Sequence, residues 1–312
     1  MAAQANLQAT LTALVLAASV GCAAEPKANL ADVTCTQSDF LPSLAMPEAS
    51  AVAPIVMHGT TRLVVISDSG HAGSFTAIDT TTGAAIKSGQ LPLGATSDDI
   101  EGATVLQGDL IGVTSAGWIY RWHFDDALDQ FALVAPPYPL APVDPNLPLD
   151  GGSGESPPPE GSGMACGAEG QNCGRNYESI CLSPTPSNAR DACVGLVVSK
   201  SEGHAYCLTL RDGVLQVDRD RNFLVGLPGA LADCAIDAEN RAWIGANILT
   251  FGRVFVLTHW DKLPAAPIVQ RTDDATIGVP EGIAVVGADV YRFSDAGKNT
   301  VSAMAKYSCV VP

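Results

Sequence analysis

The chain repeats one phrase five times: Glu48-Ala-Ser-Ala-Val52, Glu101-Gly-Ala-Thr-Val105, Glu178-Ser-Ile-Cys-Leu182, Asp233-Cys-Ala-Ile236 and Glu281-Gly-Ile-Ala-Val285. In each copy an acidic residue opens a short apolar run. After most copies a second apolar run ends on a Ser/Thr-rich turn with glycine: Leu63-Val-Val-Ile-Ser-Asp-Ser-Gly70, Leu110-Ile-Gly-Val-Thr-Ser-Ala-Gly117, Leu196-Val-Val-Ser-Lys-Ser-Glu-Gly203 and Val290-Tyr-Arg-Phe-Ser-Asp-Ala-Gly297. A unit of several short strands that recurs roughly every 40–50 residues is typical of a β-propeller. The sequence therefore predicts an all-β chain that forms a single propeller, with its acids near one end of the central channel.

Five openings predict five blades. A sixth, degenerate blade in the long interval between Glu101 and Glu178 is the alternative. The last unit, residues 281–309, has room for only three strands. We expect the segment Asp39–Leu44 to form a strand that completes this last blade, because closing the ring leaves no open sheet edge.

One segment interrupts the repeat. Residues 141–175 are crowded with Pro, Gly, Ser and Glu, which predicts an exposed insert that cannot bury enough apolar surface to order itself. In the blade that follows, the first strand is either Glu178–Leu182 or Val194–Val198. The propeller domain is expected to span residues 35–312.

The charge balance limits the partners. The chain has 17 basic and 33 acidic residues, a formal net charge of −16. Nucleic-acid binding requires a positive surface, so this balance argues against a nucleic-acid partner and favours cations. We expect a monomer that binds a small molecule or an envelope component.

The N-terminus predicts export. Residues 11–21 form a short apolar segment that ends at Cys22, with the length of a signal-peptide core rather than of a membrane span. Small residues before Cys22 resemble a bacterial lipobox, so we expect residues 1–22 to be a signal peptide with Cys22 acylated, and residues 23–34 to be a linker. The alternative is plain secretion after cleavage near Ala23. The protein is expected to lie in the bacterial envelope (outer membrane or periplasm), held only by a lipid anchor, or to be secreted.

The remaining cysteines fit an oxidising compartment. There are eight of them: Cys35, Cys166, Cys173, Cys181, Cys193, Cys207, Cys234 and Cys309. An even number in an exported chain indicates disulfides, although about 105 pairings are conceivable. Because a propeller brings its two ends together, we predict a Cys35–Cys309 bond. A local bond between Cys181 and Cys193 is predicted across the polar stretch that they bracket.

The acids are the candidate site. If each opens an innermost strand, Glu48, Glu101, Glu178, Asp233 and Glu281 surround one rim of the channel. Grouped carboxylates either raise their pKa values or recruit a cation, and oxygen ligands favour Ca²⁺ or Mg²⁺. Further candidate binding residues at this rim are Asp68, His71, Asp98 and Asp99. The alternative is that each acid caps a neighbouring turn.

Two family resemblances follow from particular phrases. Residues 232–246, Ala-Asp-Cys-Ala-Ile-Asp-Ala-Glu-Asn-Arg-Ala-Trp-Ile-Gly-Ala, resemble a blade of the gluconolactonase/regucalcin propellers. That resemblance implies that Asp233 binds a divalent cation and transfers a proton, with Glu48 as a second ligand. The family's third ligand, an Asn, is replaced by Glu178 or Cys193, which argues against a lactonase. Other phrases, including Asp99-Ile-Glu-Gly102, resemble phytase-like esterase propellers and their exported bacterial relatives.

These observations lead to alternative functions. The first is an exported, envelope-anchored binding or scaffold module with an acidic, Ca²⁺-binding channel mouth. The second is a metal-dependent hydrolase of a lactone, ester or phosphoester, in which Asp233 moves the proton. In a third, the domain is purely structural and its acids only cap turns.

Overall fold

The computed structural model describes residues 32–312 except 95–97, 141–175, 188, 190, 249–250, 264, 276, 296 and 298–300. The structure is built from five antiparallel sheets, each ordered from the channel outward. The first and second blades contain β3 (Ala49–Met57), β4 (Thr60–Ser67), β5 (Ser74–Asp79) and β6 (Ala85–Gln90), and β7 (Ile100–Leu106), β8 (Asp109–Thr114), β9 (Trp118–Asp125) and β10 (Gln130–Leu133), with β11 (Tyr138–Pro139) beside β9. The third and fourth blades contain β12 (Tyr177–Leu182), β13 (Gly195–Ser199), β14 (His204–Arg211) and β15 (Val214–Leu224), and β16 (Leu231–Ile236), β17 (Ala242–Ile248), β18 (Phe251–Thr258) and β19 (Ile268–Thr272). The fifth blade contains β20 (Val279–Val286), β21 (Asp289–Asp295) and β22 (Ser302–Val310), and is completed by β1 (Thr34–Gln37) and β2 (Ser43–Leu44). A single turn of 3₁₀ helix, η2, covers Trp260–Lys262.

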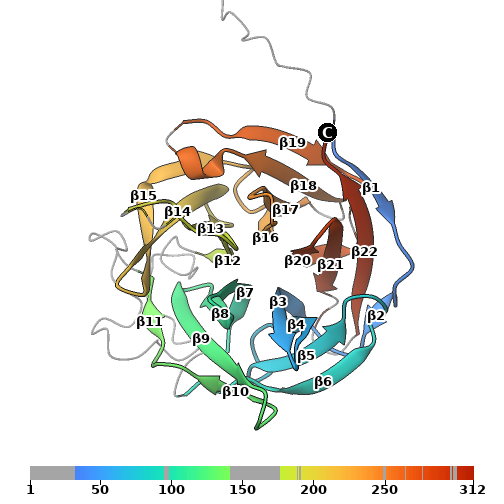
Figure 1. Ribbon diagram of the computed structural model, residues 1–312. Coiled ribbons are helices and arrows are strands. Elements are labelled where there is room, and N and C mark those ends of the chain that lie inside the picture. The colour runs from blue at the N-terminus through green and yellow to red at the C-terminus, as the bar shows by residue number, and fades with distance from the viewer. Residues whose placement is uncertain are drawn as a thin grey trace, which may run out of the picture. The chain divides into compact units, whose positions relative to one another are not determined.

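The sheets form a closed ring of five blades (Figure 1). Their first strands contact one another in the cyclic order β3, β7, β12, β16, β20 and back to β3. These five strands surround the centre of the ring. The predicted five-bladed propeller is confirmed. No helix in the described part of the chain is long and apolar enough to cross a membrane.

Strand periodicity explains how the blades stack. Successive side chains of a strand point to opposite faces of its sheet, so each blade offers one apolar face to each neighbour. In β4, Leu63 and Val65 pack toward the fifth blade, while Val64 and Ile66 pack toward the second. Among the described residues five apolar clusters arise in this way, one at each boundary between neighbouring blades.

The N-terminal segment closes the ring, as predicted, but with a different main strand. β1 pairs with β22 along Thr34–Gln37. The pairing therefore begins at the last residue of the expected linker, residues 23–34, and continues for three residues beyond it. Of the expected strand 39–44 only Ser43–Leu44 pairs with β22. Pro42 offers no N–H and has a fixed φ, which interrupts the ladder. β1 is secured by the predicted Cys35–Cys309 disulfide, whose two residues lie opposite each other in the register.

The second predicted disulfide is wrong. Cys181 bonds to Cys234 of the next blade, and Cys193 bonds to Cys207 of its own blade. In the β12–β13 register Cys181 lies opposite Leu196, not Cys193, so the two do not meet. β12 is the innermost strand of this blade, which decides between the two alternatives for it. The insert 141–175, Cys166, Cys173 and Cys22 lie outside the described residues.

Candidate cation site at the channel mouth

Each innermost strand begins with a β-bulge against its neighbour. At this point the register skips one residue, and the skipped residues are Ser50, Glu101, Glu178, Ala232 and Glu281. Three predicted acids, Glu101, Glu178 and Glu281, therefore occupy equivalent positions. Glu48 lies two residues before the bulge and Asp233 one residue after it. Because adjacent strand residues point to opposite faces, that single-residue offset gives Asp233 different surroundings.

A second set of polar residues lies at the end of the second strand of each blade or directly after it. In each blade, one residue of the second strand pairs with the inner-strand residue just before the bulge. The polar residue is the next one along the second strand: Asp68, Ser115, Lys200, Asn247 and Asp295. Only Asp68 was singled out from the sequence. A signal was present for three of the other four, because Ser115, Lys200 and Asp295, like Asp68, occur in the recurring Ser/Thr-rich turn that ends on glycine. Asn247 lies outside that turn pattern.

Three carboxylates converge closely at this mouth. Asp68, Asp99 and Glu101 each offer an oxygen, and these oxygens lie within 4.8 Å of one another. Asp68 comes from the first blade, whereas Asp99 and Glu101 come from the start of the second. Ser115 Oγ donates a hydrogen bond of 2.9 Å to Glu101 Oε1 and orients this carboxylate. An all-oxygen set of this kind matches what Ca²⁺ and Mg²⁺ prefer.

The mouth raises the pKa values of its acids. Burial raises the pKa of Asp68 to about 6, and the negative charges of the nearby Asp99, Glu48 and Asp295 add to the rise. The hydrogen bond from the Ser69 N–H lowers this pKa and opposes the rise. Burial followed by the charges of Glu178, Asp68 and Asp99 raises the pKa of Glu101 well above its usual range. Each of these acids therefore disfavours the ionised form of the others, which a bound cation would reverse.

One lysine offsets part of this repulsion. Lys200 Nζ donates to Glu178 Oε2 at 2.8 Å, and Asn176 Nδ2 donates to Glu178 Oε1 at 2.8 Å. Burial nevertheless raises the pKa of Glu178 to about 7, with Lys200 opposing the rise. For Glu281 burial also raises the pKa to about 7, again opposed by Lys200. The predicted acids of these two blades thus face the same lysine.

Glu48 binds a histidine. Glu48 Oε2 lies 2.8 Å from His71 Nε2, and only 8% of Glu48 is exposed. Its backbone has a φ of 47°, a left-handed conformation that is uncommon outside glycine and often occurs at functional sites. The backbone carbonyl of Glu48 also accepts the N–H of Asp68, which ties this pair to the carboxylate cluster.

Two predicted residues have structural partners. Asp98 Oδ2 accepts the backbone N–H of Ala72 at 2.5 Å, so it caps the turn that carries His71. Asp233 is 2% exposed and lies 3.1 Å from Nη1 of Arg292, which is itself buried completely. The structure does not bring Asp233 together with the Asp68–Asp99–Glu101 cluster, and its assignment as a catalytic residue and ligand stays a prediction.

Known structures share this fold at low sequence identity. No protein-family profile and no curated protein matches the sequence. Glutaminyl cyclase from Myxococcus xanthus is 11% identical with a TM-score of 0.50, over 88% of this chain and 97% of that protein. Regucalcin, a calcium-binding protein from Agrobacterium tumefaciens, is 9% identical with a TM-score of 0.42, over 87% of this chain and 97% of that protein.

A functionally unknown protein from Desulfotomaculum acetoxidans is 16% identical with a TM-score of 0.39. The match covers 78% of this chain but only 62% of that protein, so this chain spans less than two thirds of it. These likenesses concern the fold alone. The fold that the gluconolactonase/regucalcin resemblance implied, a β-propeller, is the fold of this chain.

Proposed function

We propose that this protein is an exported binding module whose channel mouth holds a divalent cation, Ca²⁺ in the first instance. The observation that supports it is the convergence of Asp68, Asp99 and Glu101 from two blades within 4.8 Å. Burial and the mutual repulsion of these carboxylates raise the pKa values of Asp68 and Glu101. A cation removes that repulsion, so folding and cation binding support each other.

Export is the second part of the proposal. Three disulfides among the described residues indicate an oxidising environment. Attachment through an acylated Cys22 would then place the mouth at the cell envelope, available to a small molecule or an envelope component. The acidic net charge of −16 argues against a nucleic-acid partner.

Calorimetric titration with Ca²⁺, together with thermal unfolding in EDTA and in Ca²⁺, tests the cation site. We expect binding near one ion per chain and a higher Tm in Ca²⁺. Asp99→Asn and Glu101→Gln should each weaken binding at least tenfold, because each removes a charged ligand. Asp212→Asn, in the exposed β14–β15 turn, removes the same charge elsewhere and should bind normally. Absence of binding, or equal weakening by the control, would overturn the proposal.

The His71–Glu48 pair favours a second candidate, a metal-dependent hydrolase of a lactone, ester or phosphoester. His71 can accept a proton from an attacking water while Glu48, 2.8 Å away, stabilises the resulting imidazolium. A cation at the neighbouring carboxylates would polarise the substrate oxygen.

A screen with lactones, aryl esters and phytate tests the second candidate. If one substrate is turned over, His71→Asn should lower kcat by about 100-fold or more while Ca²⁺ affinity stays unchanged, in line with the loss of a general base. Glu48→Gln, which keeps the shape of the side chain, should lower kcat less. Hydrolysis that survives His71→Asn would assign the proton transfer to another residue.

A further inference from the structure

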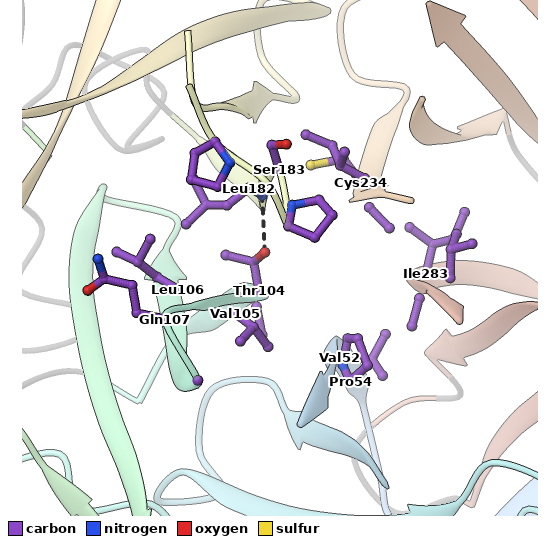
Figure 2. Close-up of a pocket in the computed structure, with 18 residues that line it drawn as sticks. Val52, Pro54, Thr104, Val105, Leu106, Gln107, Leu182, Ser183, Cys234 and Ile283 are labelled. Atoms are coloured by element: carbon purple, nitrogen blue, oxygen red, sulfur yellow. Dashed lines mark hydrogen bonds between the residues drawn. The ribbon is translucent and has the colours of Figure 1, made fainter. Parts of the chain in front are cut away.

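The channel contains a cavity on the side of the inner strands away from the acids. Its volume is about 380 Å³. All five inner strands contribute to its wall through residues that follow their bulges: Val52, Val105, Leu182, Ala235 and Ile283. Figure 2 shows these strands' side chains arranged around an open centre. At about 3.3 Å per strand residue, this wall begins several ångströms below the acidic mouth.

The wall differs in chemistry from the mouth. None of the residues that line the cavity carries a charged side chain. Two of its hydroxyl groups are engaged within the protein: Thr104 Oγ1 accepts the N–H of Leu182 at 3.1 Å, and Ser183 Oγ donates to Asn240 Oδ1 at 2.9 Å. Pro54, Pro184 and Pro186 add apolar surface without an N–H. A charged ligand would find no counter-charge here and would lose its hydration.

The wall is also covalently reinforced. Cys234 lines the cavity and is bonded to Cys181, which links the inner strands β12 and β16 of two adjacent blades. Both cysteines are almost completely buried. A cavity held open by a rigid frame costs little to organise when a ligand binds, which favours affinity for a small, mainly apolar body.

We propose that this end of the channel is a binding site for an uncharged, mainly apolar small molecule. A volume of about 380 Å³ lies in the range of small-molecule sites, roughly 300–1,000 Å³, and suits a ligand of two or three rings or a medium-length acyl chain. The site is separate from the carboxylate cluster, shares none of its residues, and does not depend on the proposed cation.

Titration with the neutral fluorophore N-phenyl-1-naphthylamine, in buffer with EDTA, tests this site. We expect a saturable rise in fluorescence with one probe per chain. Val105→Phe and Ala235→Phe fill the cavity from the second and the fourth blade, and each should weaken binding at least tenfold. Both positions are partly exposed to the cavity, so the larger side chain has room to enter it. If one variant does not fold, as judged by circular dichroism, the other decides.

The control separates the cavity from the outer surface. Leu128→Ser removes a large apolar side chain, 65% exposed, from the outer turn between β9 and β10. It should leave the titration unchanged. No saturable signal, a stoichiometry well above one, or full binding by a folded cavity-filled variant would overturn the proposal and leave a channel that holds only water.

Discussion

At the scale of single residues, the ion pair between Asp233 and Arg292 is buried on both sides. Arg292 is completely buried in β21 of the fifth blade and reaches Asp233 in β16 of the fourth. Gly245 lies opposite Asp233 in the register, and a Cβ at this position would collide with Asp233 Oδ1 and approach Arg292 Nη1. Glycine here therefore makes room for two charged groups that hold neighbouring blades together.

This geometry predicts that Asp233→Asn destabilises the protein by about 3–5 kcal/mol, because it leaves a buried guanidinium without its counter-charge. Urea unfolding measures this loss. Glu239→Gln breaks an exposed ion pair with Arg241 in the same blade and should cost only about 0–1 kcal/mol. The Tm increase in Ca²⁺ should persist in Asp233→Asn. A variant of normal stability that no longer responds to Ca²⁺ would show instead that Asp233 is a cation ligand, as its family resemblance implies.

At the scale of strands, the sequence predicts where the inner strands begin better than where their bulges fall. An acid followed by an apolar run marked all five starts to within two residues. For Glu101, Glu178 and Glu281 the acid is also the bulged residue. In the first blade Ser50 takes that position and donates to the carbonyl of Ile100 at 2.7 Å, so it bonds to the next blade's backbone. These inner strands are buried on both faces, so their apolar runs hardly alternate, and periodicity alone does not locate a bulge.

Contacts between blades were the least predictable part. The Cys35–Cys309 bond followed from the general need to close a ring. The partner of Cys181, by contrast, depends on which residues of β12 and β16 face each other, and no local pattern encodes that. The Asp68–Asp99–Glu101 cluster has the same origin, because it joins the end of one blade's second strand to the start of the next blade. The individual acids were identified from the sequence, but their grouping required the structure.

At the scale of the whole molecule, the common direction of the inner strands gives the channel two unlike ends. Every inner strand starts at the mouth, so the acids of the first, second, third and fifth blades gather there, and the apolar residues that follow them gather at the far end. The two proposals therefore address opposite ends of one channel, with a cation at one and an uncharged body at the other. Losing either site leaves the chemistry of the other intact.

The mouth also predicts how stability depends on pH. The folded-state pKa values of Asp68, about 6, and of Glu178 and Glu281, about 7, lie above the ordinary carboxyl values of about 4. Between about pH 4 and about pH 7, the folded protein therefore binds more protons at these carboxyl groups than the unfolded chain does. Their contribution to stability is therefore complete below pH 4 and is lost as the pH rises through 6 to 7.

In EDTA the Tm should accordingly fall between pH 5 and pH 8. Saturating Ca²⁺ should reduce this fall, because a cation stabilises the ionised carboxylates that form at higher pH. Glu281→Gln removes one of the groups with a raised pKa and should flatten the dependence without abolishing it. Differential scanning calorimetry across this pH range provides the measurement. A Tm in EDTA that rises from pH 5 to pH 8 would mean that the folded state does not raise the pKa values of these carboxylates, and the electrostatic basis of the cation site would be lost.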